Sequence, residues 1–294
     1  MRLNPLSLYE CSMTVAVSCS LPDGVILGVD SAVTVPASGG VAKVYENAEK
    51  IFQLGSRPIG IATYGLGALG TRSIGSYIRE FEVKKSDEIL KTKDQVKDVV
   101  EAFRQFFMEA YRDTVIRSIE ASGVSFEQVS LEQRASLTLG FIIGGFSNGA
   151  YLPEVWHIAL PSHDQPSSGI LMREQGSFGT NWFAMFEPIR RYIKGFDPAL
   201  LQEVLNFIGV SRGGAITPAE QQQIQAILQK YEYQIPYAAM PLQEGIAHTQ
   251  FLVELAINHY RFAVGANVVG GRARIGRVTY NGEKFEILRD DGRI

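Results

Sequence analysis

Four residues near the start of the chain combine chemical groups that can carry out acyl transfer. Thr14 supplies a hydroxyl, Asp30 a carboxylate, Lys50 an ammonium group and Gly65 a backbone N–H that no side chain obstructs. A hydroxyl is a weak nucleophile, and a lysine held beside it lowers the cost of forming the alkoxide. A carboxylate fixes the ammonium group, and a preorganised N–H stabilises the oxyanion that forms next. These residue types together indicate hydrolysis of an amide.

Two predicted β-hairpins would bring these residues to neighbouring strand ends. The apolar runs that predict the strands are residues 14–19, 25–29, 51–54 and 59–63. An Asp-Gly turn joins the first pair, and a Gly- and Pro-containing turn joins the second. Asp30 then ends the second strand, Lys50 opens the third, and Gly65 follows the fourth. We expect the small-residue segment 33–40 to form a loop beside the resulting cleft.

This pattern resembles the proteasome β-subunit-type threonine peptidases of the N-terminal-nucleophile hydrolases. In that family the mature chain begins with the nucleophilic threonine, and an aspartate follows sixteen residues later. Asp30 follows Thr14 by the same interval. The resemblance implies that residues 1–13 are a propeptide or an upstream extension. Their removal would free the Thr14 amine, whose pKa of about 7.7 to 8.0 suits it to take the hydroxyl proton. A second register would make Ser12 the nucleophile.

The resemblance implies an α+β fold, a four-layer αββα sandwich with two mainly antiparallel sheets, over residues 14–294. Apolar periodicity predicts a helix that starts at Leu66 and further helices at residues 93–121 and 242–262. Helix signals within residues 206–240 indicate an inserted helical element of about 35 residues, counted from that range.

Two supporting positions of the family are less well matched. The family has a serine that hydrogen-bonds near the nucleophile's amine. Thr180 is the first candidate for that role and Ser177 the second, although a cap for a predicted helix is an equal alternative. An aspartate and a serine that orient the amine correspond to Ala266 and Val269. The chain would therefore lack that supporting carboxylate. A noncatalytic ring or binding subunit of the same fold remains the first alternative.

A third interpretation comes from the glycines after the fourth predicted strand. Gly65, Gly67 and Gly70 match the G-x-G-x-x-G fingerprint of dinucleotide-binding oxidoreductases, and Glu88 stands where a ribose partner would. The strands ahead of this motif are joined by hairpins, however, and not by the crossover helices of a parallel sheet.

The composition of the chain disfavours several classes of partner and cofactor. The chain has 294 residues, is 46% hydrophobic and carries a net charge of −3, so nucleic acid is not an expected partner. Two cysteines and four histidines show no metal-ligand spacing, and we expect neither a metal nor a cofactor. No apolar run reaches the roughly 18 residues of a membrane span, which favours a cytoplasmic protein without a membrane partner.

The partners follow from the resemblance alone. It implies a homo-oligomeric ring that hides its sites in a chamber and acts on peptides or unfolded polypeptides. Whether an ATPase activator feeds such a ring stays open.

Overall fold

The computed structural model describes residues 14–37, 40–92, 94–161, 169–214, 216–264, 269–280 and 286–288. It is a mixed α+β structure that divides into two compact units. The larger unit comprises Met1–Met185 and Tyr237–Ile294, and the smaller comprises Phe186–Pro236. The prediction of an α+β fold with antiparallel sheets is confirmed.

The first sheet has five antiparallel strands. In spatial order they are β12 (Gly179–Ala184), β1 (Val15–Leu21), β2 (Gly24–Val29), β13 (Arg274–Thr279) and β14 (Glu286–Leu288). The β1–β2 hairpin pairs Leu21 with Gly24, which leaves Pro22 and Asp23 as its two-residue turn. This short local turn is what the sequence predicts, and it carries Asp30 back beside the start of β1.

The second sheet also has five antiparallel strands. In spatial order they are β11 (Ile170–Arg173), β10 (Glu154–Leu160), β9 (Leu139–Gly145), β6 (Ile59–Gly65) and β5 (Ile51–Gln53). The β5–β6 hairpin is a local pairing, whereas β6 pairs with β9 across more than seventy residues. Lys50 lies immediately before the edge strand β5.

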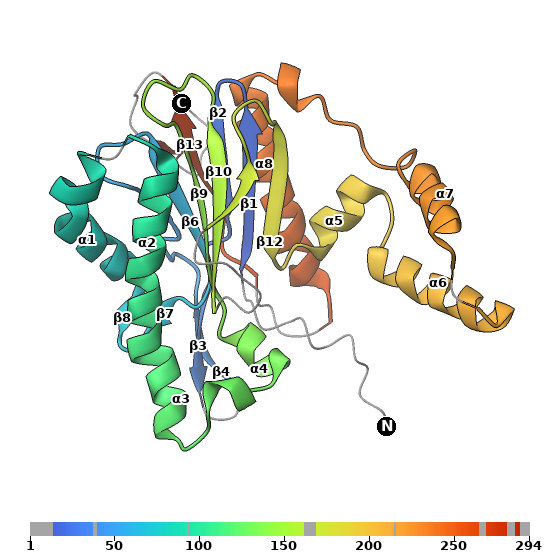
Figure 1. Cartoon of the computed structure of the whole chain (residues 1–294), viewed down its shortest axis with the longest axis horizontal. Coiled ribbons are helices and arrows are strands. Elements are labelled where there is room, and N and C mark those ends of the chain that lie inside the picture. Colours follow the sequence, from blue (N-terminus) through green and yellow to red (C-terminus); the bar gives the residue numbers. More distant parts are fainter. Residues whose placement is uncertain are drawn as a thin grey trace. The chain divides into compact units, whose positions relative to one another are not determined.

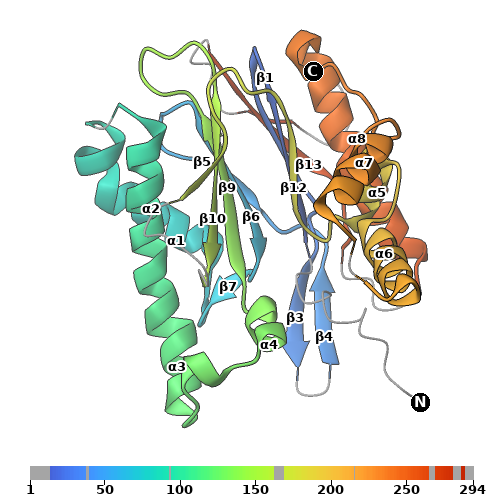
Figure 2. The same cartoon turned by 45° about the vertical axis from the view of Figure 1, so that its right-hand side comes forward.

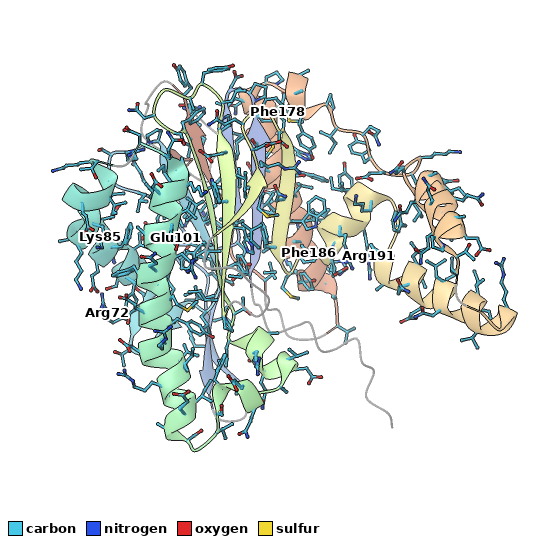
Figure 3. All side chains as sticks on the ribbon, in the orientation of Figure 1. Arg72, Lys85, Glu101, Phe178, Phe186 and Arg191 are labelled. Atoms are coloured by element: carbon cyan, nitrogen blue, oxygen red, sulfur yellow. The ribbon has the colours of Figure 1, made fainter. Side chains whose placement is uncertain are left out.

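Helices α1 (Ile74–Lys85) and α2 (Val96–Tyr111) cover the outer face of this second sheet, as Figure 2 shows. Their core is aromatic: the rings of Phe103 and Phe107 lie 5.0 and 4.5 Å from the ring of Phe141 on β9. The outward faces are polar, with Lys85 paired to Glu88 at 2.7 Å and Glu101 on the exposed side of α2 (Figure 3). Amphipathic patterning therefore decides which helix face packs on the sheet.

Helix α8 (Leu242–Phe262) packs against the first sheet, where Ile246 joins Leu21 and Ile26 in an apolar cluster (Figure 1). The inner faces of the two sheets meet through a separate cluster that includes Leu27 and Ile142. Strands β2 and β9 thus alternate between side chains on the inner face and side chains that face a helix. No helix within the described ranges combines the length and apolarity that a membrane span needs.

The smaller unit is helical. It contains α5 (Glu187–Lys194), α6 (Pro198–Arg212) and α7 (Pro218–Leu228). The Asp197 carboxylate caps α6 by accepting from Ala199 N at 2.9 Å, and Thr217 forms a capping box with Glu220 at the start of α7. Asp and Thr are residue types that favour the N-cap position. That residues 206–240 form an insertion stays a prediction.

Several sequence predictions were wrong. Segment 33–40 was expected to be a loop, but its β-branched residues form β3 (Val33–Ala37), which pairs with β4 (Gly40–Tyr45). The helix expected from Leu66 begins only at Ile74, because β7 (Ala68–Leu69) and β8 (Arg72–Ser73) form a small hairpin first. A helix was also expected directly after Thr180, which instead lies inside strand β12.

The remaining short elements complete the described chain. They are the π-helical turns Ser86–Leu90 and Arg112–Ile116, α3 (Arg117–Ala121), α4 (Leu131–Ser136) and the 3₁₀ turns Phe126–Gln128 and Tyr237–Ala239.

Candidate active site

Lys50 links Thr14 to Asp30 at the meeting point of the two sheets. Its Nζ donates to Thr14 Oγ1 at 2.9 Å and to Asp30 Oδ1 at 2.9 Å. All three residues are buried, with exposed fractions of 3% for Thr14, 0% for Asp30 and 6% for Lys50. Thr14 precedes β1, Asp30 follows β2 and Lys50 precedes β5, so three strand ends supply the group.

Backbone donors saturate the Asp30 carboxylate. Val15 N donates to Oδ1 at 3.2 Å, and Ala32 N and Gly270 N donate to Oδ2 at 3.2 and 3.3 Å. A buried carboxylate is costly unless it is paired and hydrogen-bonded, and these contacts meet that need. The bond to Val15 N also fixes the backbone next to Thr14.

Burial dominates the electrostatics of the pair. Burial lowers the pKa of Lys50 below its ordinary value, and the charge and hydrogen bond of Asp30 oppose this shift. Burial likewise raises the pKa of Asp30, while Lys50 and the backbone N–H groups pull it back. Lys50 Nζ donates to Thr14 Oγ1, so its ammonium group is placed to stabilise negative charge that develops on that oxygen.

The backbone beside Thr14 is strained. Thr14 O accepts from Met185 N at 2.9 Å, and Ala184, which pairs with Val15, has a φ of 66°. A non-glycine residue in the left-handed region costs on the order of 1 kcal/mol or more, and such strain is concentrated at functional sites. The end of β12 therefore holds Thr14 in place at some energetic cost.

Gly65 lies at the end of β6 with a φ of 83°. A Cβ there would come within 2.0 Å of Thr138 O, so close packing alone requires glycine. Leu66 N donates to Thr138 O, whereas Thr63 N donates to Lys50 O at 2.8 Å on the opposite edge of the strand. Because N–H groups alternate along a strand, the N–H of Gly65 points to the edge from which Lys50 comes.

Thr180 is not brought to this group. It pairs with Cys19, five positions along β1 from Thr14, which is about 17 Å at roughly 3.3 Å per residue. Its Oγ1 instead makes a hydrogen bond with Tyr237 Oη at 2.9 Å. Sequence reasoning missed the strand because the glycines before Thr180 look like a helix-preceding loop.

Ser12 and Ala266 lie outside the described residues. Val269 is fully buried, and the next residue, Gly270, gives Asp30 a backbone N–H in the region where the family was expected to place an aspartate and a serine. No side-chain pattern in the sequence could signal this backbone donor.

Three stacked rings, also missed from the sequence, lie beside the site. Tyr64 Oη and His157 Nε2 lie 2.6 Å apart, and the two ring planes differ by 5°. The ring of Phe183 stacks on both, at 5.7 Å from Tyr64 and 4.3 Å from His157. Phe183 pairs with Ala16, two residues from Thr14, so the rings close the inter-sheet space next to the nucleophile candidate. Burial lowers the pKa of His157 to about 4.

The strand and helix around Gly65, Gly67 and Gly70 differ from those of a dinucleotide-binding site. Strand β6, which ends at Gly65, pairs antiparallel with both of its neighbours, and α1 starts only at Ile74. The dinucleotide fingerprint places the pyrophosphate at a helix that directly follows a parallel strand. Among the described residues, no three His, Cys, Asp or Glu side chains are grouped in a way that could hold a metal ion.

Comparison with solved structures identifies the class of fold as proteasome-like. Two of the structures that match belong to Anbu proteins. Anbu (ancestral beta-subunit) from Yersinia bercovieri superposes with a TM-score of 0.54 at 10% sequence identity, covering 95% of this chain and 88% of that chain. The Anbu (Gly-1) mutant from Hyphomicrobium sp. strain MC1 superposes with a TM-score of 0.52 at 13% identity, with the same coverage of 95% and 88%.

These matches correct the family suggested by the sequence. The resemblance to proteasome β-subunit-type threonine peptidases was wrong, because the matching structures are Anbu proteins, a distinct family with a proteasome-like fold. No protein-family model and no curated protein matches the sequence. At 10 to 13% identity the likeness concerns the fold alone.

Proposed function

We propose that this protein is an amide hydrolase of the N-terminal-nucleophile type, with Thr14 as its nucleophile. The observation that carries the proposal is the position of Lys50 Nζ, which lies 2.9 Å from both Thr14 Oγ1 and Asp30 Oδ1. The proposal requires removal of residues 1–13, so that the Thr14 nitrogen becomes a free amine. The proteasome-like fold of the two Anbu matches agrees with this class of chemistry.

The proposed reaction has two half-reactions. Thr14 Oγ1 attacks the substrate carbonyl carbon, its proton passes to the Thr14 amine, and the Lys50 ammonium group stabilises the charge that develops on Oγ1. The N–H of Gly65 is our candidate to stabilise the resulting oxyanion. The C–N bond then breaks, the leaving amine takes the proton, and water hydrolyses the acyl ester to restore Thr14.

The proposal also includes the layer arrangement of the fold and the association of several copies of the chain. We infer a four-layer αββα sandwich, in which α1 and α2 cover one sheet and α8 covers the other. One matching protein is described as an ancestral beta-subunit, a name that is consistent with self-association. We propose that copies of this chain associate into a ring that acts on peptides. A chamber of that kind would let only unfolded chains reach Thr14.

Two observations favour a second candidate, a noncatalytic subunit of the same fold. Val269 is apolar and fully buried where a serine was expected, and Thr180 hydrogen-bonds Tyr237 well away from Thr14. The Thr14 amine would then have fewer side-chain partners than an active enzyme uses.

A set of four variants separates the two candidates. Thr14→Ala and Lys50→Ala are compared with Thr92→Ala and Lys97→Ala, which change exposed residues of the same types. The assay is hydrolysis of a panel of fluorogenic peptides by protein purified from its own organism. We expect the first two variants to lose at least about 10²-fold in rate and the controls to be unchanged. Hydrolysis that survives in both Thr14→Ala and Lys50→Ala would overturn the assigned roles.

A further inference from the structure

Helix α6 has an apolar face that no other described residue of the smaller unit covers. None of its residues is buried. Leu200, Val204 and Phe207 recur at i, i+4 and i+7, within an arc of about 60° at 100° per residue. They are 60%, 44% and 72% exposed. These three residues are called the α6 stripe.

The opposite face of the same helix lines a groove. A cavity of about 820 Å³ lies between α6 and α7, the two arms of the hairpin seen in Figure 1. Its apolar lining includes Leu201, Leu205, Ile224 and Leu228. Leu205 is separated from Leu201 by one turn and both point away from the α6 stripe. This cavity is called the α6–α7 groove.

Charge distinguishes the groove from ordinary helical surface. None of the described lining residues is ionisable, and the polar ones are amides such as Gln202 and Gln225. A helix that is apolar around most of its circumference is normally buried. The groove therefore suits an uncharged apolar helix, and the α6 stripe is a surface of that kind.

We propose that the α6 stripe of one copy of this chain docks into the α6–α7 groove of a second copy. The three stripe residues and the groove lining carry no charge, so the contact between them buries no ion. Seating an apolar helix face in an apolar groove is a recurrent mode of recognition. A small apolar molecule in the groove would leave the stripe in water, whereas a second copy covers both surfaces.

The geometry also determines the type of assembly. The stripe and the groove are different surfaces on opposite sides of α6, so the contact is head-to-tail. Such heterologous contacts close into rings when the rotation closes, and extend into helical filaments when it does not. This inference rests on the self-association in the proposed function, and it is independent of the chemistry at Thr14.

The test uses one variant for each surface. Phe207→Glu places a charge on the stripe, and Leu205→Glu places one in the groove. Gln223→Glu, an exposed position on α7 outside the lining, is the matched control. Molar mass is measured on the full chain by size-exclusion chromatography with light scattering over a range of concentrations. Circular dichroism checks that each variant is folded.

We expect wild type and Gln223→Glu to give the same multiple of the chain mass. Each of the other two variants alone should be a monomer or associate at least about tenfold more weakly. An equimolar mixture of Phe207→Glu and Leu205→Glu should recover a dimer, because each still offers one intact surface. An unchanged mass in either variant, or folded variants whose mixture stays monomeric, would overturn the docking. A monomeric wild type would overturn both docking and self-association, while hydrolysis would still report on Thr14.

Discussion

Lys50 donates hydrogen bonds both to Thr14, the nucleophile candidate, and to the buried Asp30 carboxylate. Substitutions can therefore separate its contribution to folding stability from its contribution to hydrolysis. Removing only one partner leaves an uncompensated buried charge. The Lys50–Asp30 contact of 2.9 Å between residues almost wholly inaccessible to water makes this pair a clear example.

We expect Lys50→Met to lower the free energy of unfolding by about 3 to 5 kcal/mol, because Asp30 is left buried and unpaired. The double variant with Asp30→Asn should be less destabilised than the sum of the two single changes. Urea denaturation measures this coupling, and peptide hydrolysis should stay lost in the double variant. Strict additivity would show that the ion pair contributes no coupling.

Because His157 is buried, we expect the free energy of unfolding to fall in acid. Its folded pKa of about 4 lies below its ordinary value of 6.5, so between these values the unfolded chain binds a proton that the folded chain excludes. Stability is therefore full above about pH 6.5 and falls as the pH drops toward 4. We expect a loss of about 2 kcal/mol, allowing for partial solvent exposure of the ring.

The measurement is the free energy of unfolding in urea at pH 7.5 and pH 5. His157→Gln should reduce the difference between the two pH values. His259→Gln, which changes an exposed histidine, should leave it unchanged. If His157→Gln keeps the full acid sensitivity, another group is responsible.

At the scale of elements, Ser147 caps helix α2 from outside the helix. Gln95 precedes α2 and makes no side-chain cap, whereas Ser147 Oγ accepts from Val96 N at 3.0 Å and donates to Glu154 Oε1 at 2.5 Å. The β9–β10 connection therefore supplies the missing cap and ties α2 to the second sheet.

We expect Ser147→Ala to destabilise the protein by about 1 to 2 kcal/mol, because Val96 N and Glu154 both lose a buried partner. Ser130→Ala removes the exposed cap of the short helix α4 and serves as the comparison. Thermal unfolding of the two variants should show the larger shift for Ser147→Ala. Equal shifts would indicate that the bond to Glu154 adds nothing.

Gly140 on β9 makes room for the ring of Tyr64. A Cβ at Gly140 would lie 2.0 Å from that ring. We expect Gly140→Ala to cost about 1 to 3 kcal/mol and to displace Tyr64 from His157. Gly214→Ala, where no atom lies within 4 Å, is the control. Near-ultraviolet circular dichroism should change only in Gly140→Ala, and an unchanged spectrum there would contradict a fixed ring.

The elements also show which features the sequence could predict. The two hairpins that place Asp30 and Lys50 are local, so turn residues and strand patterns were sufficient to predict them. Gly270 and Ala184 reach the site only through pairings between distant segments, which no local pattern encodes. Thr180 was misplaced for the same reason, because its environment depends on β12 pairing with β1.

At the scale of the whole molecule, the proposed chemistry predicts a change in covalent structure. We expect the mature protein to begin at Thr14, so its intact mass should fall by the mass of residues 1–13. Thr14→Ala should keep those residues if the site removes them itself. Mass spectrometry with amino-terminal sequencing decides this. A mature chain that keeps Met1 would argue for the noncatalytic subunit.

The hydrogen bond from Gly270 N to Asp30 Oδ2 joins residues 240 positions apart. During synthesis on the ribosome, Thr14, Asp30 and Lys50 all leave the exit tunnel long before Gly270 is made. The carboxylate that holds Lys50 therefore gains this donor only after a further 240 residues have been added to the chain. The order of synthesis therefore delays completion of the hydrogen bonds around Asp30 until residue 270 has been added.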